Sequence, residues 1–437
     1  MSRAPLLLLL CVACASPGDG STGSASGSTS GASTTGFEMT SSDELPVTTG
    51  AELPDGCDAL IRGEDGTEAL AAAIGGAAEN RTICVSGRFA GISTIEASNV
   101  MGLTLRGVDA GEGIGAGAVF DFAGIAGAPG LQFTEVDGLT LENFSVVNAV
   151  GDGLVVSGGQ DVTIRRVRVA FDAPNNGGQL FGIRADTLTR VLVDECSAVG
   201  GADAGIFVQA STSVVVRGSH ASGNVSGIEL ENCALGEVHD NEVEGNVIGL
   251  FVLDLPESPF GNGGDILVRD NVSRANNLAN FAPEELVVAS IPNGIGALVL
   301  ASDRVELRGN EFNNNDTTGV LVVSFAVVEL LSGTMHMDVS YDPYPQTVEI
   351  HGNTFVDNGQ MPAELLASVF MIATGPAILW DGAFDELNNE PSQRLCIRDN
   401  GDADFLNMDA LNLGENKSAD LAPHDCDHPD VAPVDEG

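Results

Sequence analysis

The sequence has little positive charge and few aromatic side chains. Of its 437 residues, 18 are Lys or Arg and 62 are Asp or Glu, so the formal net charge is −44, and only 5% are Phe, Trp or Tyr. A surface of this charge repels nucleic acid and anionic membranes, so we expect neither as a partner. It attracts cations, basic proteins and neutral polymers, although acidic residues also serve simply to keep a protein in solution.

The sequence also lacks the short motifs of common catalytic and cofactor sites. It contains no Walker loop, no serine-hydrolase elbow and no HExxH metal motif. It has neither the EF-hand nor the RTX spacing for Ca²⁺, and without a CxxCH motif it is not expected to bind haem covalently. The segment HDCDH at 424–428 holds metal-ligating residue types, but Cys426 is expected in a disulfide, which argues against a metal site. The sequence therefore leaves any metal unknown.

The first residues predict an exported protein. Residues 1–13, MSRAPLLLLLCVA, have one basic residue and an apolar run too short to span a bilayer, as in a signal peptide. This end resembles a bacterial lipoprotein signal with Cys14 as the acylated residue, although Cys11 stands where such signals usually carry Leu. We expect an outer-membrane or cell-surface lipoprotein whose only membrane contact is this anchor. The alternative is cleavage after Ala15, which leaves a soluble periplasmic or secreted protein.

The segment that follows, residues 14–56, is rich in Ser, Thr and Gly and predicts a flexible linker behind the lipidated Cys. Export places the remaining cysteines in an oxidising compartment, where disulfides form. Cys57 and Cys84 lie near the start of the folded region, and Cys396 and Cys426 lie near its end. We expect each pair to form a disulfide that fastens one end of the fold, although other pairings of these cysteines stay open.

One pattern repeats from Arg190 to Asp254. Each copy has an apolar alternation, a polar turn, a glycine and a second apolar alternation, and the glycines lie 22 or 23 residues apart. The glycines, with one from a looser earlier copy, are Gly182, Gly205, Gly227 and Gly249. A repeat of this length that is built from strands predicts a solenoid.

Alignment on these glycines sorts the following residues into columns. The first and third residues after each glycine are apolar and are expected to face the core, whereas the second and fourth face outward. The outward residues are Arg184, Phe207, Glu229 and Phe251 in one column, and Asp186, Gln209 and Glu231 in the other.

Two more columns come from the strand before the polar turn. An Asn recurs at one position of later coils, namely Asn241, Asn271, Asn310 and Asn353, and stacked Asn side chains are expected to form a structural ladder. Cys196 has this position in an earlier coil and is expected to be a buried thiol, with no bond to Cys233. Basic residues recur beside this column, at Arg106, Arg165, Arg217, His239, Arg269, Arg308 and His351. We expect them to neutralise neighbouring acidic residues; binding of a polyanion is the alternative.

The chain resembles the right-handed parallel β-helix proteins of the pectate-lyase-like superfamily, and within it a subfamily of exported bacterial proteins with such repeats. The residues that carry the resemblance are ADAGIFVQ at 202–209, GIELEN at 227–232, LDLP at 253–256, NFAPE at 280–284, DPYP at 342–345 and CIRDNGDADF at 396–405. The resemblance implies an all-β, right-handed parallel β-helix over residues 57–382, with a helix at 65–78 covering its open N-terminal end. A cap segment at 383–426 and a disordered tail at 427–437 are expected to follow.

Proteins of this superfamily mostly act on polysaccharides, as lyases, hydrolases, epimerases or tailspike-type binders. The resemblance therefore implies a monomer that binds or modifies an extracellular polysaccharide. The expected catalytic residues are Asp186, Glu231, Asp254 and Arg184. The expected substrate-binding residues are Gln209, Phe207, Glu229, Phe251 and Glu284. Carboxylates suit sugar hydroxyls or proton transfer, and aromatic rings suit the apolar faces of sugars.

Several lyases of the superfamily use Ca²⁺ and a basic residue as proton acceptor, so Ca²⁺ is the cofactor that the resemblance allows, with Arg184 as the base. Asp254 precedes the first of three insertions, which are residues 256–264, 276–294 and 326–346. Loops inserted into a solenoid usually gather on one side and carry its function. Two other interpretations stay open. In the first, the acids only form a solvated face, and the insertions cover Phe207 and Phe251. In the second, the chain is a non-catalytic scaffold. For a scaffold, the resemblance implies docking of a c-type-cytochrome-like protein.

Overall fold

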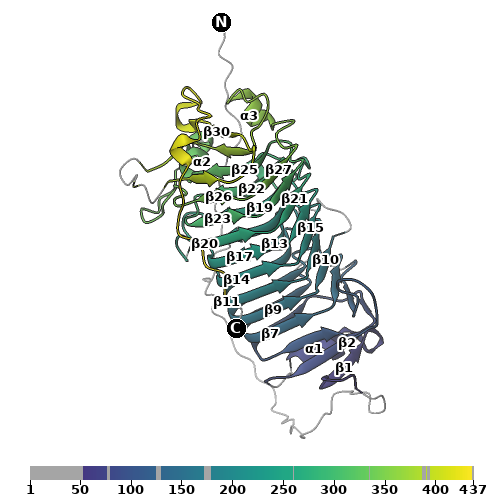
Figure 1. The fold of residues 1–437 in the computed structure, drawn as a ribbon. Coiled ribbons are helices and arrows are strands. Elements are labelled where there is room, and N and C mark those ends of the chain that lie inside the picture. Colours follow the sequence, from purple (N-terminus) through teal and green to yellow (C-terminus); the bar gives the residue numbers. More distant parts are fainter. Residues whose placement is uncertain are drawn as a thin grey trace, which may run out of the picture.

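The computed structural model describes residues 53–75, 79–124, 129–171, 179–258, 260–333, 335–385, 390 and 394–435. The predicted signal peptide, Cys14 and most of the predicted linker lie outside these residues. The described chain is an elongated solenoid in which each strand pairs in parallel with strands one coil before and after it (Figure 1). Within the described residues the strands form one sheet of 20 and one of 10, which confirms the predicted all-β parallel β-helix.

Each coil has three faces. The first face contains β4 (Ile95–Met101), β13 (Ala204–Gln209), β16 (Ser226–Glu231), β19 (Ile248–Leu253), β22 (Ile295–Leu300), β25 (Thr318–Val323), β28 (Ile378–Trp380) and β30 (Phe405–Asn407). The second face contains β1 (Ala59–Arg62), β2 (Thr82–Ser86), β5 (Thr104–Gly107), β14 (Thr212–Arg217), β17 (Ala234–His239), β20 (Gly264–Arg269), β23 (Val305–Arg308), β26 (Glu349–His351) and β29 (Cys396–Arg398). Long strands β7 (Leu131–Glu142), β9 (Leu154–Arg165) and β11 (Phe181–Asp194) cover both faces.

The third face is the smaller sheet. It contains β3 (Arg88–Ala90), β6 (Val119–Asp121), β8 (Ser145–Val147), β10 (Arg168–Ala170), β12 (Ser197–Val199), β15 (His220–Ser222), β18 (Glu242–Glu244), β21 (Val272–Arg274), β24 (Glu311–Asn313) and β27 (Thr354–Val356). The helices described are α1 (Gly66–Gly75), α2 (Phe325–Ser332) and α3 (Glu364–Ser368), with 3-10 turns η1 (Gly63–Asp65), η2 (Val287–Ser290), η4 (Ala410–Asn412) and η5 (Ala422–His424).

The core lies inside the coil and is covered at one end by α1. The inward residues Ile206, Ile228 and Leu250 are at most 2% exposed, as the column alignment predicts. Leu70 and Ile74 of α1 join the same apolar core and cover its open end, which confirms the predicted capping helix; residues 76–78 of that prediction lie outside the described chain.

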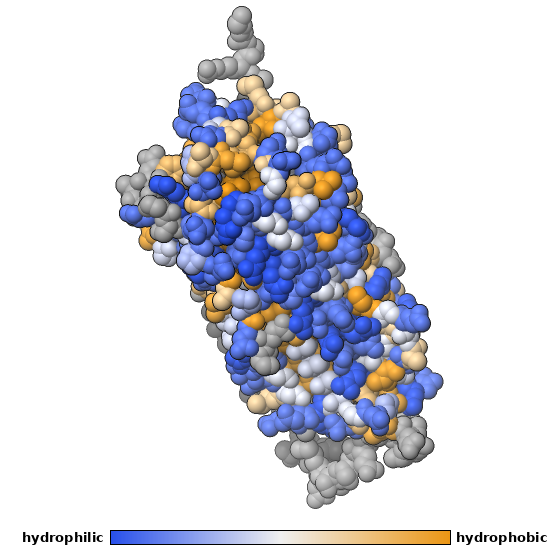
Figure 2. All heavy atoms as spheres, in the orientation of Figure 1, coloured by the Kyte–Doolittle hydropathy of each residue, from blue (hydrophilic) through white to orange (hydrophobic). Residues whose placement is uncertain are grey.

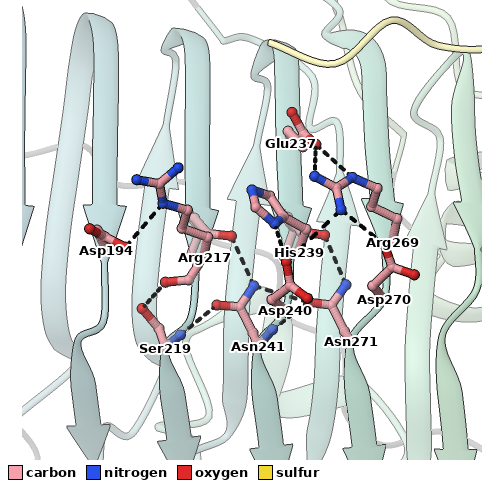
Figure 3. A network of polar contacts seen from close by, with 12 residues as sticks. Asp194, Arg217, Ser219, Glu237, His239, Asp240, Asn241, Arg269, Asp270 and Asn271 are labelled. Carbon is pink, nitrogen blue, oxygen red and sulfur yellow. Dashed lines mark hydrogen bonds and ion pairs between the residues drawn. The ribbon is translucent and has the colours of Figure 1, made fainter. Parts of the chain in front are cut away.

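Buried Asn side chains hold the turns of successive coils together. The side-chain amides of the predicted column donate to the next Asn oxygen at 2.9 to 3.2 Å, from Asn241 through Asn271, Asn310 and Asn353 to Asn400. Figure 3 shows the step from Asn241 to Asn271. This confirms the ladder. A second ladder, which the sequence analysis missed, lies five residues further along each coil and contains Asn224, Asn246, Asn276, Asn315 and Asn358. The constant spacing of five residues between the two sets of Asn was the sequence pattern that could have predicted the second ladder.

The cysteines and the basic column also follow their predictions. Disulfides join Cys57 to Cys84 and Cys396 to Cys426, whereas Cys196 and Cys233 are free and buried. Basic residues of the second face pair with acids on the same face, including Arg269 with Glu237, which Figure 3 shows, and Arg398 with Glu349, each at 2.7 Å. The basic column therefore neutralises buried acids, as expected, and these guanidinium groups already have carboxylate partners.

The second and third insertions, together with the segment around α3, cover the outer side of the first face in its later coils. Outward residues of β19, β22, β25 and β28 form a second apolar cluster with insertion residues; they include Phe251, Leu298, Leu321 and Leu379. In Figure 2, hydrophobic residues gather near the end that holds α2 and α3, and hydrophilic residues cover most of the middle of the solenoid. The insertions thus divide the first face, because its outward residues before β19 lie outside this second cluster.

The C-terminal end differs from its prediction. The predicted cap segment contributes β29 and β30 to the sheet, so the coil continues into it. The predicted disordered tail lies against the second face as far as residue 435, and Val431 is buried. The backbone N–H groups of His428, Val431 and Val434 donate to Glu349, Glu306 and Glu237 at 3.1, 2.7 and 2.9 Å.

A physical reason explains the ordered tail. Glu237, Glu306 and Glu349 are each 2% exposed, and a buried carboxylate needs donors for both of its oxygens. Arginine or histidine of the same face supplies some donors and the tail supplies the others, which Figure 3 shows at Glu237 beside the yellow C-terminal segment. The side chains of His424 and His428 contact the carbonyl oxygens of Leu395 and Arg394.

Removal of residues 427–437 is expected to destabilise the solenoid, because three buried carboxylates each lose a donor. Water replaces part of each lost hydrogen bond, so the expected loss is on the order of 1 kcal/mol per bond. Urea unfolding of the full chain and of a chain ending at Cys426, which keeps its disulfide, measures the difference. Equal unfolding free energies would show that the tail contributes nothing.

Candidate functional site

The predicted outward columns lie side by side on the first face. Arg184 of β11 is in register with Phe207 of β13, which is in register with Glu229 of β16. The same pairings align Asp186, Gln209 and Glu231 in the neighbouring column, and alternation along each strand directs both columns away from the core. These strands lie just before the part of the face that the insertions cover.

Side-chain contacts join these columns into one polar network. Arg184 donates from Nη2 to Oδ2 of Asp186 at 2.9 Å, and its Nη1 lies 3.9 Å from Oδ2 of Asp152. Its guanidinium also lies over the ring of Phe181, 5.3 Å from the centroid. Gln209 donates from Nε2 to Oε1 of Glu231 at 2.6 Å. These ion pairs let Arg184 balance part of the negative charge and hold Asp186 in place, and its predicted role as the base stays a prediction.

Two further acids belong to this network. Asp152 and Asp203 lie in the turns that precede β9 and β13. The charge of Asp203 interacts with those of Glu229, Glu231 and Asp152, and the charge of Asp152 also interacts with that of Arg184. We call Asp152, Asp186, Asp203, Glu229 and Glu231 the acidic cluster. Neither Asp152 nor Asp203 was predicted, although Asp152 directly precedes Gly153 and Asp203 lies two residues before Gly205. These positions were not among the aligned columns.

The acidic cluster contains buried oxygens without partners. Asp203 is 8% exposed and Glu229 is 2% exposed, and neither Oδ1 of Asp203 nor Oε2 of Glu229 has a hydrogen-bond partner within the described chain. The Nε of Arg184 is buried without a partner as well. Asp186, Arg184 and Glu231 are only half-buried, so the cluster has an edge that a ligand can reach. Unpartnered buried polar groups are rare in proteins and usually need a functional explanation.

Burial and mutual repulsion raise the pKa values in the acidic cluster. Burial raises the pKa of Glu231 from 4.5 to about 7, with a smaller contribution from Asp186. Burial, then the charges of Glu231 and Asp152, raise the pKa of Asp203 to about 7. Burial and the charges of Asp203 and Glu231 hold the pKa of Glu229 well above 4.5. Near neutral pH these carboxyl groups therefore share protons, which is the condition for proton donation and acceptance at one site.

Asp254 continues this acidic region toward the insertions. It is 1% exposed, its Oδ2 accepts from the N–H of Gly263 at 2.8 Å, and its Oδ1 has no partner in the described chain. Burial and the charges of Asp303 and Glu231 raise its pKa to about 8. The hydroxyl of Tyr341, in the third insertion, donates to the backbone oxygen of Asp254 at 2.7 Å. The structure thus brings Asp186, Glu231 and Asp254 into one region, as predicted.

Three predicted substrate-binding residues are placed differently. Phe207 is 4% exposed and stacks on Phe181 with 4.3 Å between ring centroids, and Phe251 is 1% exposed in the second apolar cluster. Neither ring presents a face to solvent, because apolar burial is more favourable than exposure. Glu284 is exposed in the second insertion, and no hydrogen bond or ion pair joins it to the acidic cluster among the residues described. The expected aromatic groove closed by Glu284 is therefore not formed.

The described residues were also considered for metal-binding clusters and for membrane-spanning helices. No three His, Cys, Asp or Glu side chains lie together in a way that could hold a metal ion, as far as the structure describes the chain. Ca²⁺ remains an expectation from the sequence resemblance. No helix in the described ranges is both long and apolar enough to cross a membrane.

One family model matches part of the chain. Residues 129–263 match the family model described as "Right handed beta helix region", whereas no curated protein matches the chain. One similar solved structure is the A-module of the mannuronan C-5 epimerase AlgE4 of Azotobacter vinelandii, with 16% identity, a TM-score of 0.45 and coverage of 78% of this chain and 94% of that chain.

Two other structures are similar to the same solenoid. Pectate lyase Pel9A has 13% identity and a TM-score of 0.37, with coverage of 65% of this chain and 69% of that chain. PfbA, a surface adhesin of Streptococcus pneumoniae, has 12% identity and a TM-score of 0.37, with coverage of 73% and 82%. At these identities the similarity concerns the fold alone. Together, the coil geometry and the matched family model show that this chain is a right-handed parallel β-helix protein.

Proposed function

We propose that the chain binds or modifies an extracellular polysaccharide at the acidic cluster. The observation that carries the proposal is the pair of buried oxygens without partners, Oδ1 of Asp203 and Oε2 of Glu229, behind the half-buried edge formed by Arg184 and Asp186. Leaving such a group unpartnered costs about 1–3 kcal/mol, which donation from a ligand hydroxyl recovers. Sugars present many hydroxyl donors, and an open strand face suits an extended polymer.

The same groups support proton transfer to or from a bound sugar. Glu231 has a half-buried side chain and a pKa raised to about 7, so it carries a proton near neutral pH and is our candidate general acid. Asp186, two coils away in the same column and paired with Arg184, is our candidate acceptor. Proton donation and acceptance at one sugar are the requirements of glycan cleavage, elimination and epimerisation.

Export is part of the proposal. The disulfides Cys57–Cys84 and Cys396–Cys426 indicate an oxidising compartment such as the periplasm or the cell exterior. Acylation of Cys14 would tether the solenoid to a membrane through the segment 14–56, and the chain would meet polysaccharides outside the cytoplasm. Mass spectrometry of the mature N-terminus tests this part; an unmodified N-terminus at Ser16 would replace the anchor by simple secretion.

Replacement of Glu231 by Gln is expected to lower turnover at least ~100-fold on any glycan that the chain modifies, because a general acid contributes about that much. Pectate, alginate and cell-wall glycans, each with and without Ca²⁺, form the test panel, with binding and new chain ends measured in parallel. Glu284→Gln is the matched control, since it makes the same change on an exposed acid outside the cluster.

Different results of this experiment would contradict the proposed site and the proposed function. Activity that survives Glu231→Gln would move the site elsewhere. No binding to any glycan in the panel would contradict the function. In that case salt-sensitive co-purification with a basic c-type-cytochrome-like protein would favour the alternative of a docking scaffold, which the net charge of −44 supports.

A further inference from the structure

We infer that the acidic cluster recognises a positively charged sugar, in which a protonated amino group replaces a hydroxyl. This inference rests on the proposed function and names its substrate class. It follows from the balance of charge at the site, from the oxygens that lack partners and from the charge of the whole chain.

The acidic cluster has more acids than its one guanidinium can balance. Arg184 pairs with Asp186 and lies near Asp152, and in the described chain no ion pair joins Asp203, Glu229 or Glu231 to any cation. A buried carboxylate is costly unless a cation or several donors accompany it. With no cation beside them, these buried acids hold protons when the site is empty, and a bound cation can take the place of those protons.

An ammonium group fits this shortage better than a hydroxyl does. It carries three N–H donors and a full positive charge, whereas a hydroxyl offers one donor and no charge. The unpartnered Oδ1 of Asp203 and Oε2 of Glu229, each on a side chain more than nine-tenths buried, provide two acceptors, and the half-buried Glu231 provides further acceptor capacity beside them. Charge-assisted hydrogen bonds of this kind are about twice as strong as neutral ones.

The rest of the molecule favours the same class of polymer. A chain with a net charge of −44 repels uronate polymers and attracts polycations over long range. Coils recur about 4.8 Å apart along the first face, so a polymer that lies along the solenoid places successive units against successive coils. This geometry selects an extended glycan with repeated amino groups over a single small cation.

Protons accompany this recognition. The titratable groups that face the site are Asp152, Arg184, Asp186, Asp203, Glu229, Glu231 and Asp254, from the turns before β9 and β13, from β11 and β16, and from the end of β19. The raised pKa values mean that the empty site holds protons below about pH 7. A bound ammonium stabilises the ionised carboxylates, so binding releases those protons.

The test compares a glucosamine hexamer with an N-acetylglucosamine hexamer, which has the same backbone without the charges. Calorimetric titrations at about pH 6, where aliphatic amines are charged, use buffers of different ionisation heat. We expect the glucosamine hexamer to bind at least ~10-fold more tightly than the N-acetylglucosamine hexamer, which corresponds to about 1.4 kcal/mol of binding free energy. We also expect its binding to release protons. Glu229→Gln is expected to remove most of this preference, and circular dichroism checks its fold. Glu284→Gln is the control for general attraction to an acidic surface.

Each of the remaining results contradicts one named part of the inference or of the proposed function. Equal binding of the two hexamers contradicts the inference and leaves the proposed function intact. Binding of neither hexamer, together with activity on another glycan that depends on Glu231, also contradicts only the inference. If Glu229→Gln and Glu284→Gln weaken the preference for the glucosamine hexamer equally, the attraction comes from the whole acidic surface and not from the acidic cluster. Equal binding of a lysine hexamer, with the same loss in Glu229→Gln, would assign the site to a basic protein partner instead.

Discussion

Replacement of Gly249 by Ala is expected to destabilise the solenoid severely. A Cβ at this position would collide with the backbone oxygen of Gly296 in the next coil and with the side chains of Ser273 and Asn276. The backbone oxygen cannot move without breaking strand pairing between β19 and β22, and Asn276 belongs to the second Asn ladder. Overpacking of this kind costs about 1–3 kcal/mol, and the displaced Asn adds a comparable loss.

Urea unfolding measures this effect against a matched substitution. Gly75, at the end of α1, has no atom of the described residues within 4 Å of an added Cβ, so Gly75→Ala is expected to be neutral or to stabilise by up to ~1 kcal/mol. If Gly249→Ala unfolds at the same urea concentration as Gly75→Ala, the close approach of coils at the glycine column is not a constraint on this fold.

The protein is expected to lose stability as the pH rises from about 4 to about 8. The folded-state pKa values of Glu231, Asp203 and Asp254 are raised to about 7, 7 and 8 from 4.5, 3.8 and 3.8. The folded protein thus retains protons that the unfolded chain has released, and stability falls wherever the folded state binds more protons. The rise at Glu231 alone corresponds to roughly 3 kcal/mol.

Between pH 5 and pH 8, buried His424 acts in the opposite direction. Burial lowers the pKa of His424, so its protonation in the unfolded chain reduces stability below about pH 6.5. A single histidine is outweighed by several coupled acids, so the net slope between pH 5 and pH 8 is expected to be negative.

Thermal unfolding across this pH range measures the slope. Glu229→Gln removes an acid whose pKa burial and neighbouring charges hold well above 4.5, so this variant is expected to have a flatter profile and a higher midpoint at about pH 8. Glu284→Gln, on an exposed acid, should keep the original slope. Stability that rises toward pH 8, or a Glu229→Gln profile parallel to that of the original chain, would contradict the raised pKa values.

The repeating parts of this molecule were predictable because each coil imposes the same constraints on the next. The glycine column, the inward apolar columns and the Asn241 ladder all follow from one alignment. The terminal disulfides followed from export and from the position of their cysteines. The same alignment predicted that Asp186, Gln209 and Glu231 share a column.

The remaining features depend on parts of the chain that do not repeat. Phe251 looks like an outward ring in its own coil and is buried only because later insertions fold over it. Asp203 lies in a turn, where one coil differs from the next, so periodicity gave it no role. The ordered tail could not be predicted for a similar reason, because the carboxylates that accept its hydrogen bonds lie up to 197 residues earlier in the chain.

That tail changes how the solenoid is held together. A stack of coils in which each contacts only its neighbours is free to fray from an end, one coil at a time. Here the last residues return across β26 and β23 to β17, so loosening of the final coils also removes contacts from the middle of the stack. The C-terminal half is therefore expected to open as one cooperative unit, and a nascent chain completes that unit only after its final residues have left the ribosome.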